Sequence, residues 1–271
     1  MNGWQALLLG LIQGLTEFLP VSSSGHLTIG REILGIEASG DLVFEVAVHA
    51  ATVLATIVVF RKEIWRLLCG LFKFRYNDET DYILKICLSM IPVLLVGLFL
   101  KDKVEGLFAS LLTVGLALVV TAMLLFFSDV FTRKQEKEAA AEPAVRNGIS
   151  WWQALVIGIG QAFAVIPGLS RSGTTISTGL LCGVKRDRVA QFSFLMVLVP
   201  ILGEAFLDVV GGEAAASSIG TMPLIIGFLS AFVSGLFACK LMISLVKKAK
   251  LSWFALYCAI VGLLVIIYTM F

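Results

Sequence analysis

Long apolar stretches separated by short polar ones run along the whole chain and predict membrane helices. Apolar runs lie at 43–60, 83–100, 107–127, 190–208, 224–243 and 252–271. A helix needs about 20 apolar residues to cross a hydrocarbon core of roughly 30 Å. Because backbone amides in lipid must be bonded within their own segment, each run is expected to be an α-helix that spans the membrane.

Two further apolar stretches, at 4–19 and 151–166, each stop at a polar loop that contains proline and glycine. Short apolar pieces follow them at 26–36 and 174–184. These pieces are too short to span a bilayer, so each pair is predicted to form a re-entrant helix–loop–helix. Irregular backbone is tolerated at membrane depth where it is buried in protein or lines a wet cavity.

The two halves of the chain begin with related sequences. Residues 4–26 and 152–174 align without a gap and are identical at 9 of 23 positions. Each half then has one hairpin and three membrane spans. A re-entrant hairpin does not cross the membrane and three crossings are an odd number, so the second half has the opposite orientation in the membrane to the first. We therefore predict an all-α integral membrane protein with an inverted repeat, whose loops meet near the midplane. The first repeat is 1–128, a cytoplasmic linker is 129–150, and the second repeat is 151–271.

The distribution of charge predicts an orientation. If the first hairpin enters from outside and the second from the cytoplasm, 17 of the 21 Lys and Arg residues fall on the cytoplasmic side. Positive charge concentrates on that side of membrane proteins. Both ends of the chain and the first loop are then expected to be external.

Composition excludes several classes of protein. Apolar residues make up 58% of the chain and charged residues 15%, and the mean hydropathy is +0.95. A water-soluble domain does not have this composition. No basic face suits nucleic acid, and no phosphate-binding or dinucleotide motif suggests a nucleotide or organic cofactor. The five cysteines are scattered, without a CxxC pair, and are expected to be small core residues.

Arg171 is the clearest candidate for chemistry, because an ionisable residue at membrane depth is costly unless it is functional or paired. It follows Pro167 and Gly168 in the second loop. A guanidinium holds phosphate through two parallel hydrogen bonds and keeps its proton. The alternative is a structural ion pair, with Glu17 as partner. Amides at a helix N-terminus and neighbouring hydroxyls would bind the same anion; these residues are Ser170, Ser172, Gly173, Thr174 and Thr175.

The first loop carries acid–base candidates. Gln13 and Glu17 are four residues apart and share a helical face, and Glu17 and His26 are natural proton acceptors or donors. The alternative for His26 is a buried structural histidine. His49 and Glu45 are also four residues apart, but two possible ligands indicate a metal only weakly; structural hydrogen bonding and a function remain open for them. Serine and glycine suit a nucleophile or close contact with an anion; these are Ser22, Ser23, Ser24 and Gly25.

Two strings, QGLTEFLPVSSSGH (13–26) and PGLSRSGTTIS (167–177), closely resemble the signature motifs of the undecaprenyl-diphosphatase, or bacitracin-resistance, family. FEVAVH (44–49) is similar too. The resemblance covers the chain in length and order of elements. It implies hydrolysis of undecaprenyl diphosphate to undecaprenyl phosphate and inorganic phosphate, which recycles the lipid carrier of peptidoglycan synthesis. It also implies the bacterial cytoplasmic membrane and an active site that opens to the external side.

The resemblance also suggests roles. Ser23 would attack the terminal phosphorus while Glu17 takes its proton and Arg171 holds the diphosphate. His26 would orient the phosphate or protonate the leaving group; attack by His26 itself, or by water, remains open. Such a family implies a divalent cation, Mg²⁺ or Ca²⁺, although the sequence shows no ligands for one. The family's first motif has Glu or Gln, then three residues, then Glu. This chain has glutamine at the first of these positions, Gln13, so Glu17 is the only carboxylate in the loop.

The expected partners are a polyprenyl diphosphate and membrane lipids, without nucleic acid, and the sequence leaves a homodimer open. Transport is the alternative function. Inverted repeats with broken helices are typical of alternating-access carriers, and a flippase for lipid phosphate would use the same anion site. A carrier has less need of Glu17, Ser23 and His26 in one loop, which favours the hydrolase.

Overall fold

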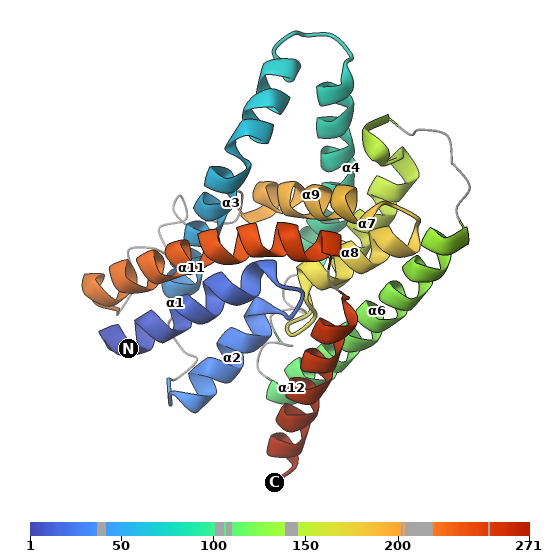
Figure 1. The fold of residues 1–271 in the computed structure, drawn as a ribbon. Helices are drawn as coiled ribbons and strands as arrows, with labels where there is room; N and C mark the ends of the chain where they lie inside the picture. The colour runs from blue at the N-terminus through green and yellow to red at the C-terminus, as the bar shows by residue number, and fades with distance from the viewer. Residues whose placement is uncertain are drawn as a thin grey trace.

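The computed structural model describes residues 1–36, 42–100, 106, 110–138, 146–201, 203, 219–248 and 250–271, and its described elements are all helical (Figure 1). Within these described ranges, five helices are long and apolar enough to cross a membrane. The prediction of an all-α, multi-pass protein is therefore confirmed. The predicted loops at 37–41 and 101–105, the middle of the linker at 139–145, and residues 204–218, which hold the end of a predicted span and the loop after it, lie outside the described residues.

The helices follow the predicted order. In the first half they are α1 (Gly3–Phe18), α2 (Ser23–Ile33), α3 (Leu42–Leu71), α4 (Asp78–Phe99) and α6 (Leu111–Glu138). A short 3-10 turn, η1 (Arg146–Gly148), comes before the second half. There they are α7 (Trp151–Phe163), α8 (Arg171–Leu181), α9 (Arg186–Met196), α11 (Thr221–Lys248) and α12 (Ser252–Met270).

Two regions differ from the prediction. The expected span at 190–208 is interrupted, because α9 ends at Met196 and a turn follows at Val197; residues 202 and 204–208 lie outside the described part. The expected linker starts as helix, since α6 continues to Glu138. Asp129 is 1% exposed there, and the Ser252 hydroxyl donates to its carboxylate at 2.5 Å. Arg186 also pairs with this carboxylate at 2.9 Å, and these two partners explain why a charged residue is buried in the helix instead of starting a solvated linker.

Each hairpin packs against a span from the other half. α1 lies along α11, and α7 lies along α4 (Figure 1). Gly10 and Gly158, which are identical in the two related segments, lie at these contacts. A Cβ on Gly10 would be 2.4 Å from the carbonyl oxygen of Gly227, and a Cβ on Gly158 would be 2.4 Å from that of Ser89. Small residues let membrane helices approach this closely.

The glutamine near the start of each hairpin ties its two helices together. The amide of Gln5 donates to the carbonyl of Leu34 at the end of α2, at 3.2 Å. Gln153 makes the corresponding bond to Cys182 at the end of α8, at 2.9 Å. Each broken segment is thereby held folded back on itself, which places its loop at a fixed point.

The contact at Gly158 gives a stability prediction. Gly158→Val would force α7 away from α4, and overpacking of this kind costs about 1–3 kcal/mol or more. We expect a lower unfolding temperature in detergent. The control is Gly97→Val on α4, since a Cβ on Gly97 meets nothing within 4 Å. Equal unfolding temperatures for the two variants would contradict the close packing of these helices.

Candidate active site

An ion pair joins the two loops. Glu17 lies in the last turn of α1 with its side chain 5% exposed, and Arg171 is the first residue of α8. The guanidinium of Arg171 donates to Oε1 of Glu17. The structure thus shows the ion pair with Glu17 that the sequence left open as the alternative for Arg171, and it joins residues from the two halves of the chain.

The other oxygen of Glu17 accepts two more hydrogen bonds. The hydroxyl of Ser23 donates to Oε2 at 2.6 Å, and the side-chain amide of Gln13 donates to the same oxygen at 3.0 Å. Ser23 is held there because it is the first residue of α2. A serine hydroxyl on a carboxylate is the arrangement of a nucleophile with its base. Oε1 of Gln13 is buried and has no hydrogen-bond partner within the described part of the chain.

The backbones of the two loops touch. The hydroxyl of Ser172 donates to the carbonyl of Leu19 at 3.1 Å. Gly168 has a φ of +88°, in the left-handed region that favours glycine. A Cβ on Gly25 would lie 3.2 Å from the Cα of Gly168. A side chain at Gly25 would press on the other loop, whereas one at Gly168 would clash with α6, 2.6 Å from the carbonyl oxygen of Val114.

Two of the predicted phosphate-binding serines begin helices. Ser22 caps α2 by accepting from the amide of Gly25 at 3.2 Å, and Ser170 caps α8 by accepting from that of Gly173 at 3.1 Å. Ser22 also has a φ of 71°, an uncommon conformation for a residue with a side chain. Strain of this kind occurs at functional sites where surrounding contacts hold it. Contacts of these four residues with phosphate remain a prediction.

The remaining loop hydroxyls have different surroundings. The Thr175 hydroxyl donates to the carbonyl of Arg171 at 2.8 Å and lies 2.6 Å from the hydroxyl of Ser193 on α9. Thr175 therefore holds α8 against α9. Oγ1 of Thr174 is buried without a partner among the described residues, and the Ser24 hydroxyl is 3.4 Å from that of Ser22.

His26 is bonded to groups other than Glu17. Its Nδ1 lies 2.8 Å from the carbonyl of Ser22, and its Nε2 lies 2.8 Å from the hydroxyl of Tyr257 on α12. The two rings are stacked, with centroids 5.6 Å apart. Because a carbonyl only accepts, Nδ1 carries the proton and Nε2 accepts from Tyr257. Sequence reasoning missed Tyr257, whose one signal, a polar tip in an apolar helix, is shared by aromatic residues at membrane interfaces.

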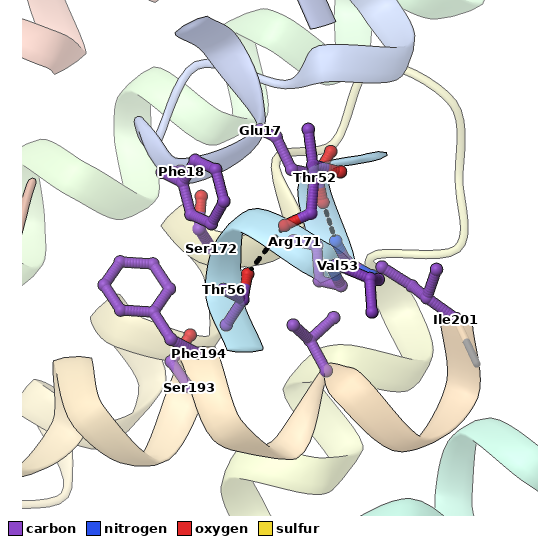
Figure 2. A pocket seen from close by; sticks show the side chains of 11 residues that line it. Glu17, Phe18, Thr52, Val53, Thr56, Arg171, Ser172, Ser193, Phe194 and Ile201 are labelled. Carbon is purple, nitrogen blue, oxygen red and sulfur yellow. Dashed lines mark hydrogen bonds and ion pairs between the residues drawn. The ribbon is translucent and has the colours of Figure 1, made fainter. Parts of the chain in front are cut away.

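A cavity of about 20 Å³ lies beside the ion pair, which is room for a water molecule (Figure 2). Figure 2 shows Glu17 and Arg171 pointing toward each other at its edge, with Thr52 and Thr56 nearby on α3. Sequence reasoning missed these threonines within an apolar span. Their spacing of four residues, which places both on one helical face, was the available signal. The rest of the lining is Phe18, Val53, Ser172, Ser193, Phe194, Val197 and Ile201.

His49 also approaches Glu17 from α3. Its Nε2 is 4.0 Å from Oε2 of Glu17, and its Nδ1 is 2.8 Å from the backbone carbonyl of Glu45. The carboxylate of Glu45 instead pairs with Arg31 at 2.6 Å. His49 and Glu45 therefore do not point their side chains at a common metal position.

The side chains of the site do not fit a divalent cation held by the protein alone. Among the described residues, no group of three His, Cys, Asp or Glu side chains could hold a metal. Both oxygens of Glu17 accept from protein donors, and the guanidinium of Arg171 beside Oε1 would repel a second cation there. Mg²⁺ or Ca²⁺ at this site remains a prediction.

Residues 6–264 match the family model described as "Bacitracin resistance protein BacA". The chain belongs to the BacA family. It is 54% identical to an undecaprenyl-diphosphatase of Bacteroides fragilis, over 98% of each chain. An undecaprenyl-diphosphatase of Parabacteroides distasonis is 53% identical, over 100% of this chain and 99% of that one. An undecaprenyl-diphosphatase of Methanobrevibacter smithii is 36% identical, over 96% of this chain and 95% of that one. The likeness to these BacA-family relatives spans both loops of the site.

Proposed function

We propose that this chain hydrolyses undecaprenyl diphosphate to undecaprenyl phosphate and inorganic phosphate in the bacterial cytoplasmic membrane. Membership of the BacA family and the names of its relatives support the substrate. One observation supports the chemistry: a single buried carboxylate, Glu17, accepts from the hydroxyl of Ser23 on one oxygen and from Arg171 on the other. A nucleophile, its base and a phosphate-binding cation thus lie at one point.

The residues divide the reaction among them. The guanidinium of Arg171 moves from Glu17 to the diphosphate and stabilises the charge on the transferred phosphoryl group. Ser23 attacks the terminal phosphorus, Glu17 accepts its proton, and the bond to the lipid phosphate breaks. N-terminal amides of α2 and α8 add donors for the anion.

Ser23 is favoured over His26 as the nucleophile. Nε2 of His26 accepts from Tyr257, so attack through this nitrogen would first require that bond to break. His26 instead orients the start of α2 through its bond to Ser22. Trapping a covalent phosphoenzyme distinguishes the nucleophiles. Attack by Ser23 gives an acid-stable phosphoserine, attack by His26 gives an acid-labile phosphohistidine, and direct attack by water gives neither.

The topology is also part of the proposal. Two re-entrant hairpins in an inverted repeat would let the loops meet near the midplane and open to the external side. The packing of α1 on α11 and of α7 on α4 supports this relation, as do the matching bonds of Gln5 and Gln153. A homodimer remains a prediction.

Release of phosphate from undecaprenyl diphosphate by purified protein in detergent tests the function. We expect turnover, because hydrolysis needs one compartment whereas transport needs two. Micelles without protein are the control. No release would contradict the proposal and favour a carrier of lipid phosphate. A second arm of the experiment adds EDTA to test for a divalent cation. If the enzyme uses one, EDTA is expected to stop phosphate release, and added Mg²⁺ or Ca²⁺ to restore it.

A further inference from the structure

A serine phosphatase has to remove a proton twice, and this site offers one carboxylate. In the first step Glu17 accepts the proton of Ser23 and becomes neutral. A water molecule must then attack the phosphoserine and lose a proton of its own. Protonated Glu17 cannot accept it, and it is needed as the acid that returns a proton to Ser23. Because the lipid phosphate leaves as an anion without that proton, Glu17 enters the second step protonated, and a second base lets it keep its proton for Ser23.

His49 has the position and the tautomer of that base. The carbonyl of Glu45 lies 2.8 Å from Nδ1, and because a carbonyl only accepts, Nδ1 carries the proton of the neutral ring. The lone pair is therefore on Nε2, which faces Oε2 of Glu17 at 4.0 Å. Ser23 donates to that same oxygen, so His49 and Ser23 approach one atom from α3 and α2.

The separation suits a bridging water. Two atoms 4.0 Å apart are beyond direct hydrogen bonding, but one water at about 2.8 Å from each can contact both. The side chain of His49 is 29% exposed, against 5% for Glu17. The side chain of His49 is therefore less enclosed by protein than the carboxylate of Glu17.

Other groups close to Glu17 are unsuitable as the second base. In the part of the chain that the structure describes, the ion-pair partners of Glu17 are Arg171 and His49. Arginine does not give up its proton in proteins. Gln13 is neutral, and Nε2 of His26 accepts from Tyr257.

We propose that His49 is a catalytic base for release of phosphate from Ser23, an inference that rests on the proposed function. Water attacks the phosphorus of phosphoserine, and its proton passes to Nε2 of His49. The bond between phosphorus and the serine oxygen breaks, and that oxygen takes the proton that Glu17 holds. The products are inorganic phosphate, free Ser23, ionised Glu17 and protonated His49, which then loses its proton to solvent.

The test separates the two steps in His49→Gln, which keeps a polar side chain of similar size without a base at neutral pH. The probe is undecaprenyl diphosphate with ³²P in its terminal phosphate, mixed with enzyme and quenched in acid. We expect a rapid burst of undecaprenyl phosphate, accumulation of labelled phosphoserine, and phosphate release slowed by about 10²-fold or more. Glu63→Gln, near the other end of α3 and paired with Arg66, is the matched control and is expected to behave as wild type.

His49→Ala gives a second measurement. Added imidazole is expected to restore part of its phosphate release, whereas a folding defect is not repaired by a small base. The proposal is overturned by wild-type release in both variants, by equal slowing of the burst and of release, or by turnover that survives Ser23→Ala. A wild-type protein that releases no phosphate contradicts the proposed function itself, so the two failures are distinguishable.

Discussion

Arg171→Ala is expected to lower kcat/KM for undecaprenyl diphosphate by roughly 10³-fold or more. Arginines that stabilise a transferred phosphoryl group contribute on the order of 10³ to 10⁵ in kcat. The same change leaves the buried carboxylate of Glu17 without its cation. Phosphate release in detergent measures the first effect, and the unfolding temperature measures the second.

Arg171→Lys and Arg66→Ala serve as the comparison variants. Lysine keeps the charge but loses the planar fork that grips two phosphate oxygens, so activity is expected between those of wild type and Arg171→Ala. Arg66 forms exposed ion pairs with Glu63 and Glu79 at the end of α3, and its loss is expected to leave turnover unchanged. Turnover near that of wild type in Arg171→Ala would show that the guanidinium does not contact the reacting phosphate.

Glu17→Gln is expected to lower kcat by about 10²- to 10⁴-fold, the usual contribution of a positioned base. The amide oxygen can still accept from Arg171 or Ser23, so the fold and the KM should change less than kcat. Single-turnover formation of undecaprenyl phosphate measures this step directly. Glu63→Gln, an acid in an ion pair away from the site, is the control.

The hydrogen bond between Glu17 and Ser23 also predicts the activity of a double variant. Residues that act as a unit are strongly non-additive. The double variant Glu17→Gln/Ser23→Ala should therefore be about as slow as Ser23→Ala alone. Multiplied losses in the double variant would mean that Glu17 acts on a group other than Ser23.

The candidate residues of the loops could be located from the sequence because their signals are local. Proline and glycine break the apolar runs, and Glu17 and Arg171 are charges where lipid tolerates few. The repeat also predicted that the loops meet, and their contact through Ser172 and Leu19 is now visible. Helix–loop–helix segments at 4–36 and 151–184 agree with α1–α2 and α7–α8.

What the sequence could not provide depends on contacts between distant segments. Tyr257 meets His26 across most of the chain, and no local spacing indicates that pair. The spacing of His49 and Glu45 left structural hydrogen bonding and a shared function open, and it did not show that the carboxylate of Glu45 pairs with Arg31. Asp129 looked like part of a solvated linker because its partner Ser252 lies far along the sequence.

The pairing of Glu17 with Arg171 has a consequence for the end of each catalytic cycle. Inorganic phosphate bound to Arg171 competes with the carboxylate of Glu17 for the guanidinium. Because Glu17 belongs to the same chain, its effective concentration at Arg171 is in the millimolar range or above. The lipid diphosphate brings a hydrocarbon chain that offsets this competition, whereas free phosphate brings none. We therefore expect phosphate to be a weak inhibitor, since the returning carboxylate displaces it and resets the enzyme for the next lipid.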